Sequence, residues 1–304
     1  MKSRLEKQLR DAERVRKFWA KSDRKRDCAV KERLDVVQIR NLSYKDSPAD
    51  KDCTCHLFDI YYPRQITLPE YPVIVNVHGG GWFYGDKELY APYAKYLASK
   101  GFAVVNFNYR LAPVHRYPSA FEDVCALMEY LIAHAESFRL NLSCLNMTGD
   151  SAGAQLAAQY AVFATNPDYR AFFPSLSDVN VILPQKLALN CGLYRLDETR
   201  KQFSSDWYLP ETVTTEIAES AFRMLSYLTP QFPSCYVMGS VNDTLLEESR
   251  MLHQKLTELD VLHIYREFGE GNPKSGHVFH LNLMNPEGEE CNSQEILFFN
   301  GGLQ

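Results

Sequence analysis

Residues 142–164 read LSCLNMTGDSAGAQLAAQYAVFA, and this stretch decides the fold. Its first part predicts a buried strand over 142–147, and its last part predicts an alanine-rich helix that ends near residue 164. The motif GDSAG at 149–153 lies between them, with a glycine two residues to either side of Ser151. A sharp strand-to-helix turn of this kind exposes a serine hydroxyl at the helix N-terminus. Ser151 is therefore a candidate nucleophile, and the alternative is a simple helix N-cap serine.

The same alternation of strand and helix patterns extends along the chain on both sides of this stretch. Short apolar or β-rich runs predict strands at 36–44, 55–62, 73–77, 102–107, 142–147, 187–190, 235–238 and 262–268. Helical patterns occur between them, for example over 87–99 and 120–138. Strands that alternate with helices form βαβ units. The sequence therefore predicts an α/β fold with a mostly parallel eight-stranded sheet and helices on both faces.

Two regions depart from this alternation. Residues 1–34 contain 13 Lys/Arg and 6 Asp/Glu, a net charge of +7 in a chain whose total is −5, and their apolar spacing predicts an amphipathic helix over 4–20. Three roles are open for this helix: packing on the main body, covering an active site as a lid, or anchoring to a membrane surface. Residues 193–230 look inserted at the edge of the sheet where ligands bind in open α/β folds. We therefore expect a cap region over 1–35, a catalytic domain over 36–304, and a cap insertion over about 193–230.

Composition excludes several classes of protein. The 304 residues are 45% hydrophobic and 23% charged, as in ordinary globular proteins. No run of about 18 apolar residues occurs, and the polar N-terminus is not a secretory signal, so we expect a cytoplasmic protein without a membrane partner. The mild net charge gives no basic field for nucleic acid. The cysteines include no CxxC pair, so we expect free thiols, no metal site and no cofactor.

The motif HGGGW at 78–82 directly follows the predicted strand 73–77. Three consecutive glycines are costly in conformational entropy, so their presence indicates a need for close approach to the backbone. Backbone N–H groups in such a loop, together with the N–H after the nucleophile, stabilise the negative oxygen that forms in acyl transfer. The sequence therefore predicts an oxyanion hole here, and the alternative is a flexible turn.

A serine nucleophile needs a base and an orienting carboxylate, which in this architecture follow it in the order Asp or Glu, then His. His277 follows the loop after the strand 262–268, whereas His263 lies within that strand, so we prefer His277 and keep His280 as the alternative base. Asp243 follows the strand 235–238 and is the candidate acid. Such an aspartate holds the imidazole tautomer and stabilises the imidazolium.

These motifs, together with YRLAP at 109–113, resemble the hormone-sensitive-lipase-like branch of the α/β-hydrolase superfamily over about residues 36–279. The resemblance implies a catalytic triad of Ser151, Asp243 and His277. It implies an oxyanion hole formed by Gly80, Gly81 and Ala152, and a cap formed by the N-terminal helix and the insertion. It also implies that His78 braces the glycine loop. The sequence departs from residues common in that branch at Val114, Ala154 and Thr244.

We therefore predict a serine carboxylesterase that hydrolyses esters with short, acetyl-type acyl groups through an acyl-enzyme. The same triad also serves an amidase or small-peptide hydrolase, and a ligand receptor without turnover is a further alternative. Trp82, Asp150 and Trp207 are candidate pocket residues. The expected partner is a small-molecule ester, and similar hydrolases suggest a homodimer formed through an edge strand.

Overall fold

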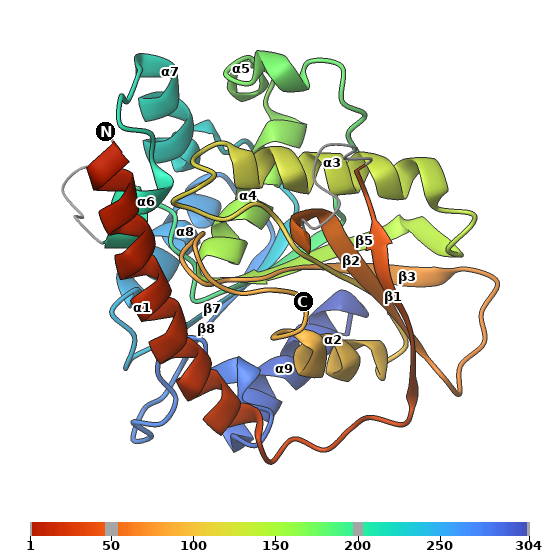
Figure 1. Cartoon of the computed structure of the whole chain (residues 1–304). Helices are drawn as coiled ribbons and strands as arrows, with labels where there is room; N and C mark the ends of the chain where they lie inside the picture. The colour runs from red at the N-terminus through yellow and green to blue at the C-terminus, as the bar shows by residue number, and fades with distance from the viewer. Residues whose placement is uncertain (1, 46–53, 197–202, 303–304) are drawn as a thin grey trace.

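One sheet of eight strands forms the centre of the molecule (Figure 1). The computed structural model describes residues 2–45, 54–196 and 203–302. The strand order is β1-β2-β4-β3-β5-β6-β7-β8. The strands are β1 (Val36–Ser43), β2 (Leu57–Pro63), β3 (Tyr71–Val77), β4 (Ala103–Phe107), β5 (Leu140–Asp150), β6 (Lys186–Asn190), β7 (Ser234–Ser240) and β8 (His263–Phe268). Only the pairs β1·β2 and β2·β4 of this sheet are antiparallel.

Helices cover both faces of this sheet (Figure 1). The helices are α1 (Lys2–Asp27), α2 (Ala91–Ala98), α3 (Ser119–His134), α4 (Ala152–Thr165), α5 (Pro167–Arg170), α6 (Phe203–Tyr208), α7 (Thr215–Ile217), α8 (Leu246–Glu258) and α9 (Pro286–Phe299). Because side chains alternate along a strand, Val73 and Val75 belong to the buried cluster that includes α3 and α4, whereas Ile74 belongs to the one that includes α2 and α9. The expected mostly parallel, eight-stranded sheet with helices on both faces is confirmed.

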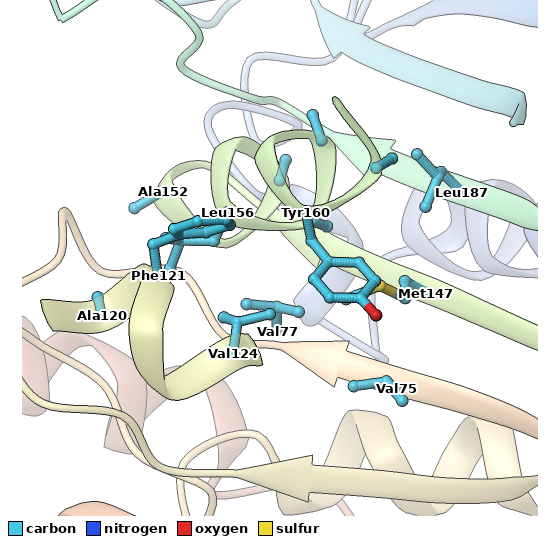
Figure 2. Close-up of a cluster of buried hydrophobic side chains, with 14 of the residues drawn as sticks. Val75, Val77, Ala120, Phe121, Val124, Met147, Ala152, Leu156, Tyr160 and Leu187 are labelled. Carbon is cyan, nitrogen blue, oxygen red and sulfur yellow. The ribbon is translucent and has the colours of Figure 1, made fainter. Parts of the chain in front are cut away.

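Buried apolar side chains fill the space between α3, α4 and the central strands. Figure 2 shows Phe121 of α3 and Leu156 and Tyr160 of α4 gathered above Val77 of β3 and Met147 of β5. These side chains are essentially inaccessible to solvent. Residues 152–162 of α4 are all buried, and most of them are apolar, as expected for a helix enclosed by the core. The N-terminus of α4, which follows Ser151, is therefore held firmly at the edge of the sheet.

The helix α9 was not among the sequence predictions. It begins after Asn285, whose side chain accepts a hydrogen bond from the backbone N–H of Glu287, and Pro286 occupies its first turn. An Asn-Pro pair is a recognised helix-start signal, so this helix had a local signature. Its cap is nevertheless easy to miss because the following residues, 287–290, are mostly charged or glycine.

The predicted N-terminal helix exists and packs on the main body as α1. Ala12 is fully buried, and the ring of Trp19 lies 5.0 Å from that of Phe83. The guanidinium of Arg16 donates hydrogen bonds to two backbone carbonyl oxygens, at 2.7 Å to Phe83 and at 2.8 Å to Ala112. Packing on the main body, one of the alternatives for this helix, is therefore observed, and a lid role stays a prediction.

The cysteines do not all match expectation. Cys55 is disulfide-bonded, so the prediction of free thiols is wrong at that position. Cys53 lies outside the described residues. Free thiols occur at Cys28, Cys125, Cys144, Cys191, Cys235 and Cys291. Across the described part of the chain, no helix combines the length and the apolar character needed to span a membrane.

Candidate active site

Ser151 occupies a strained turn between β5 and α4, with φ 52° and ψ −118°. Glycine is required at both flanking positions, because a Cβ atom there would clash with the neighbouring backbone. A Cβ on Gly149 would lie 2.6 Å from the carbonyl carbon of Gly153, and a Cβ on Gly153 would collide with the carbonyl oxygen of Val77. The backbone N–H of Ser151 donates to Asn190 at the end of β6 over 2.9 Å. The GDSAG motif thus forms the predicted turn, because no side chain fits at either glycine.

The glycine loop after β3 presents unused backbone donors. Gly80 and Gly81 have φ of 105° and 60°, and a Cβ on Gly80 would collide with the carbonyl oxygen of Tyr84. Within the ranges that the structure describes, the N–H groups of Gly80, Gly81 and Ala152 donate no hydrogen bond to the protein. Free, oriented N–H groups beside a nucleophile are what stabilisation of an oxyanion requires.

His78, the first residue of the glycine loop, is held in place by three contacts. Its ring stacks on Tyr109, with ring centroids 4.0 Å apart and an angle of 11° between the planes. The hydroxyl of Tyr109 donates to the His78 carbonyl oxygen over 2.8 Å, and His78 Nδ1 lies 2.8 Å from the carbonyl oxygen of Gly79. A carbonyl only accepts, so Nδ1 carries the proton. Burial lowers the pKa of His78 to about 4, which keeps the ring neutral at pH 7.

Asp150 joins the serine turn to the glycine loop. Its Oδ2 accepts a hydrogen bond from the hydroxyl of Tyr90 over 3.0 Å, and that hydroxyl accepts one from the N–H of Gly79 over 2.9 Å. Burial raises the pKa of Asp150 to about 6, although the Tyr90 hydrogen bond and the nearby His277 act in the opposite direction. The Asp150 side chain is buried, and these contacts are all with protein groups.

Asp243 and His277, 34 residues apart in the chain, form a direct hydrogen bond. His277 Nδ1 lies 2.7 Å from Asp243 Oδ2, and Asp243 Oδ1 accepts from the N–H of Leu245 over 2.9 Å. Burial raises the pKa of Asp243, but these hydrogen bonds and the His277 charge outweigh it, so the pKa is lowered overall. The carboxylate therefore holds the proton on Nδ1 and leaves Nε2 free to act as a base.

The strand ends bring this pair toward Ser151. The N–H of Ser151 bonds to Asn190, and the next residue, Cys191, has its Sγ within 4.8 Å of both an Asp243 carboxylate oxygen and a His277 ring nitrogen. Among the described residues, no hydrogen bond joins the Ser151 hydroxyl to His277. Such contacts often tighten only when substrate is bound.

Among the described residues, neither His280 nor His263 hydrogen-bonds to Asp243, and the nearby carboxylate of Glu248 bonds elsewhere. His280 is fully buried, its ring nitrogens have no hydrogen-bond partner among the described residues, and burial lowers its pKa to about 3. His263 Nε2 lies 2.7 Å from His253 Nδ1. Glu248 accepts hydrogen bonds from the backbone and side chain of Arg195. Of the bases that the sequence left open, only His277 meets the predicted acid.

A buried chain of hydrogen bonds next to the site was not predicted. Trp82 Nε1 donates to Gln155 Oε1 over 3.1 Å, and Gln155 Nε2 donates to Gln159 Oε1 over 2.8 Å. Gln159 Nε2 then donates to Tyr117 Oη over 3.0 Å, which donates to Ser220 Oγ over 2.9 Å. This chain links the glycine loop, α4 and the inserted segment. Its signal was two glutamines four residues apart in an alanine-rich helix.

The three candidate pocket residues are all buried. Trp82 stacks on Tyr208 with ring centroids 4.7 Å apart, and Trp207 meets Phe83 edge-on at 4.9 Å. The inserted segment therefore packs directly on the residues that follow the glycine loop. Substrate contact by Trp82, Asp150 or Trp207 stays a prediction.

The BD-FAE family model matches residues 58–256, a range that includes Ser151 and Asp243 and ends before His277. An acetyl esterase of Salmonella paratyphi B is 30% identical over 221 residues, which is 67% of this chain and 64% of the relative. The alignment thus spans less than two thirds of the relative's own length.

Solved structures show the same fold. Esterase B of Lactobacillus rhamnosis, with a bound tributyrin phosphonate inhibitor, has a TM-score of 0.82 at 23% identity and covers 97% of this chain and 95% of its own. The Pyrobaculum calidifontis esterase has a TM-score of 0.76 at 20% identity and covers 95% and 93%. At such identities the likeness establishes the architecture.

Proposed function

The chain belongs to the BD-FAE family, within the hormone-sensitive-lipase-like branch of the α/β-hydrolase superfamily, and from this membership we propose that it is a serine carboxylesterase. The observation that carries the proposal is the 2.7 Å contact between Asp243 and His277 at the same end of the sheet as the strained Ser151 turn. Neither a structural serine nor a structural histidine requires this combination.

In the proposed mechanism, His277 Nε2 takes the proton of the Ser151 hydroxyl while Oγ forms a bond to the ester carbonyl carbon. The carbonyl oxygen becomes negative and accepts hydrogen bonds from the N–H groups of Gly80, Gly81 and Ala152. The C–O bond to the leaving group then breaks, and the departing alcohol takes the proton from Nε2. Water repeats the sequence on the acyl-enzyme, which releases the acid and restores the serine hydroxyl.

Asp243 stabilises the imidazolium that exists between the two proton transfers. Its carboxylate already accepts the Nδ1 proton, and its lowered pKa keeps it ionised through the cycle. The neutral, buried His78 takes no part in proton transfer, because its Nδ1 is bonded to the Gly79 carbonyl.

We propose short acyl groups, of the acetyl type, as the substrate class. The relatives named acetyl esterase support this choice. The packing of the inserted segment also supports it. Tyr208 stacks on Trp82 and covers that side of the glycine loop, which limits the space for a long acyl chain. We further propose that 1–35 and about 193–230 form one cap over the catalytic domain 36–304. The bond from Gln8 Nε2 to Asp206 of the insertion, at 3.2 Å, supports a joint cap.

The proposal is tested with 4-nitrophenyl acetate and a matched acetanilide. We expect the wild-type chain to hydrolyse the ester in preference to the anilide, and Ser151→Ala to remove the ester activity while far-UV circular dichroism stays unchanged. Ester hydrolysis that persists in Ser151→Ala would contradict the assignment of the nucleophile. A preference for the anilide would instead identify an amidase.

A further inference from the structure

A third side chain with metal-binding chemistry lies against the Asp243–His277 pair. Cys191 follows β6 directly, has φ 48°, and its N–H donates to the Met238 carbonyl at the end of β7 over 2.7 Å. A thiol sulfur of Cys191, a carboxylate oxygen of Asp243 and a ring nitrogen of His277 all lie within 4.8 Å of one another. Three different donor types thus converge from the ends of three strands.

This donor set matches the coordination preference of zinc. Zn²⁺ binds thiolate at about 2.3 Å, imidazole nitrogen at about 2.0–2.1 Å and carboxylate oxygen at about 2.0–2.2 Å, usually in a tetrahedron. Donors in such a tetrahedron lie roughly 3.5 Å apart. The three donor atoms already lie within 4.8 Å of one another, and the hydrogen-bonded Asp243–His277 pair, 2.7 Å apart, opens to admit the ion. Three protein ligands leave the fourth position for water.

We propose that Cys191, Asp243 and His277 bind Zn²⁺, and that the bound ion switches the esterase off. The inhibition, but not the binding, rests on the proposed function. Burial, together with the Asp243 charge, raises the pKa of the free Cys191 thiol well above its usual range, and the two charges of Zn²⁺ compensate the Asp243 carboxylate and the thiolate that forms on binding. The imidazole side chain is 40% exposed, which gives the ion an entry route past His277.

Inhibition follows from the imidazole tautomer. In the present arrangement Nδ1 carries the proton and Nε2 is free to accept one from Ser151. A zinc ion on Nδ1 replaces that proton, so the single proton of the neutral ring moves to Nε2. The Cys191 thiol releases its proton to solvent, and Asp243 binds as the carboxylate it already is. The ring then has no free nitrogen to act as a base.

Metal binding is tested first, without any reference to activity. Co²⁺ serves as the probe in place of Zn²⁺, because zinc has no d–d spectrum and a cobalt–thiolate bond gives a charge-transfer absorption. The full chain carrying Ser151→Ala is titrated alone and with Cys191→Ala or Cys125→Ala added. Cys125 is a free, buried cysteine on α3 and provides the matched control. We expect the absorption in the parent and in the Cys125 variant, and its loss in the Cys191 variant.

Inhibition is tested second, in the chain with a native Ser151. Each variant's rate on 4-nitrophenyl acetate is divided by its own rate in a metal-free buffer. Loss of a metal's supporting groups typically weakens binding about 10–100-fold, so we expect Cys191→Ala to raise the half-inhibiting zinc concentration at least about tenfold. Cys125→Ala should match the wild type. Cys191→Ser provides a second variant, with folding checked by circular dichroism.

Two results would overturn the proposal. One is a cobalt–thiolate absorption that survives in Cys191→Ala or is absent from the parent chain. The other is equal zinc sensitivity in the wild type and in both Cys191 variants. If the chain hydrolyses no ester at all, the proposed function fails while the cobalt titration still decides whether the site binds metal.

Discussion

The two sides of the site are built in opposite ways. On the oxyanion side, His78 is stacked on Tyr109, Gly79 is bonded through Tyr90 to Asp150, and Trp82 is fixed by Gln155. These side chains are buried. On the base side, His277 has a 40% exposed side chain, and among the described residues its one hydrogen bond is that to Asp243.

This difference corresponds to what each side must do. Donors that stabilise a developing charge are most effective when they are already oriented, because they then need no reorganisation during the reaction. The imidazole must instead receive a proton from one group and deliver it to another, so its ring needs access to serine, alcohol and water in turn. Rigid packing suits the first task and an open ring held at one nitrogen suits the second.

The largest expected effect comes from breaking the base side at its single contact. Asp243→Asn keeps the shape of the side chain but presents an amide to Nδ1, which favours the wrong tautomer of His277. We expect kcat on 4-nitrophenyl acetate to fall by about 10⁴-fold, with little change in the unfolding midpoint. A loss of less than about tenfold would mean that Asp243 does not orient the base.

A smaller effect is expected when one glycine on each side of the site is replaced by alanine. A Cβ on Gly80 collides with the Tyr84 carbonyl, whereas a Cβ on Gly276, beside His277, meets its nearest atom only at 3.9 Å. We expect Gly80→Ala to lower kcat by about 10²–10³-fold, the value of a displaced oxyanion donor. Gly276→Ala should change kcat by far less. Equal losses in the two variants would contradict the rigid-versus-open description.

The smallest effect concerns the hydrogen-bond chain that stiffens the oxyanion side. Gln155→Leu leaves the buried indole N–H of Trp82 without an acceptor, which typically costs about 1–3 kcal/mol of stability. Adding Trp82→Phe removes the donor as well. The loss of stability in the double variant should therefore be smaller than the sum of the losses in the two single variants. Urea unfolding of both single variants and the double variant measures this coupling. Strictly additive losses would show that the bond contributes nothing.

The same contrast explains what the sequence could predict. The turn around Ser151 and the glycine loop are local: Gly149, Gly153 and Gly80 are each required by a contact with a residue a few positions away or with an adjacent strand end. The positions of the eight strands along the chain followed equally from short-range patterns, so the fold class could be predicted and the residues proposed for the triad could be named in advance. Chain order was enough to select Asp243 and His277.

Long-range side-chain contacts could not be predicted in this way. Nothing near Cys191 in the sequence indicates that it approaches His277, because their proximity depends on the ends of separate strands. The bond between Tyr117 and Ser220 joins positions 103 residues apart, and neither hydroxyl has a recognisable local motif. The pairing of Cys55 was missed for a different reason, since scattered cysteines in a chain of this size favoured free thiols.

A serine nucleophile activated by a histidine reacts covalently with a fluorophosphonate probe, so this probe tests whether His277 activates Ser151. The wild-type chain is incubated with the probe, and the adduct is located by intact mass and peptide mapping. We predict one adduct, on Ser151, which is absent in Ser151→Ala and forms far more slowly in His277→Ala. An unlabelled wild-type chain, or an adduct on another residue, would contradict the account.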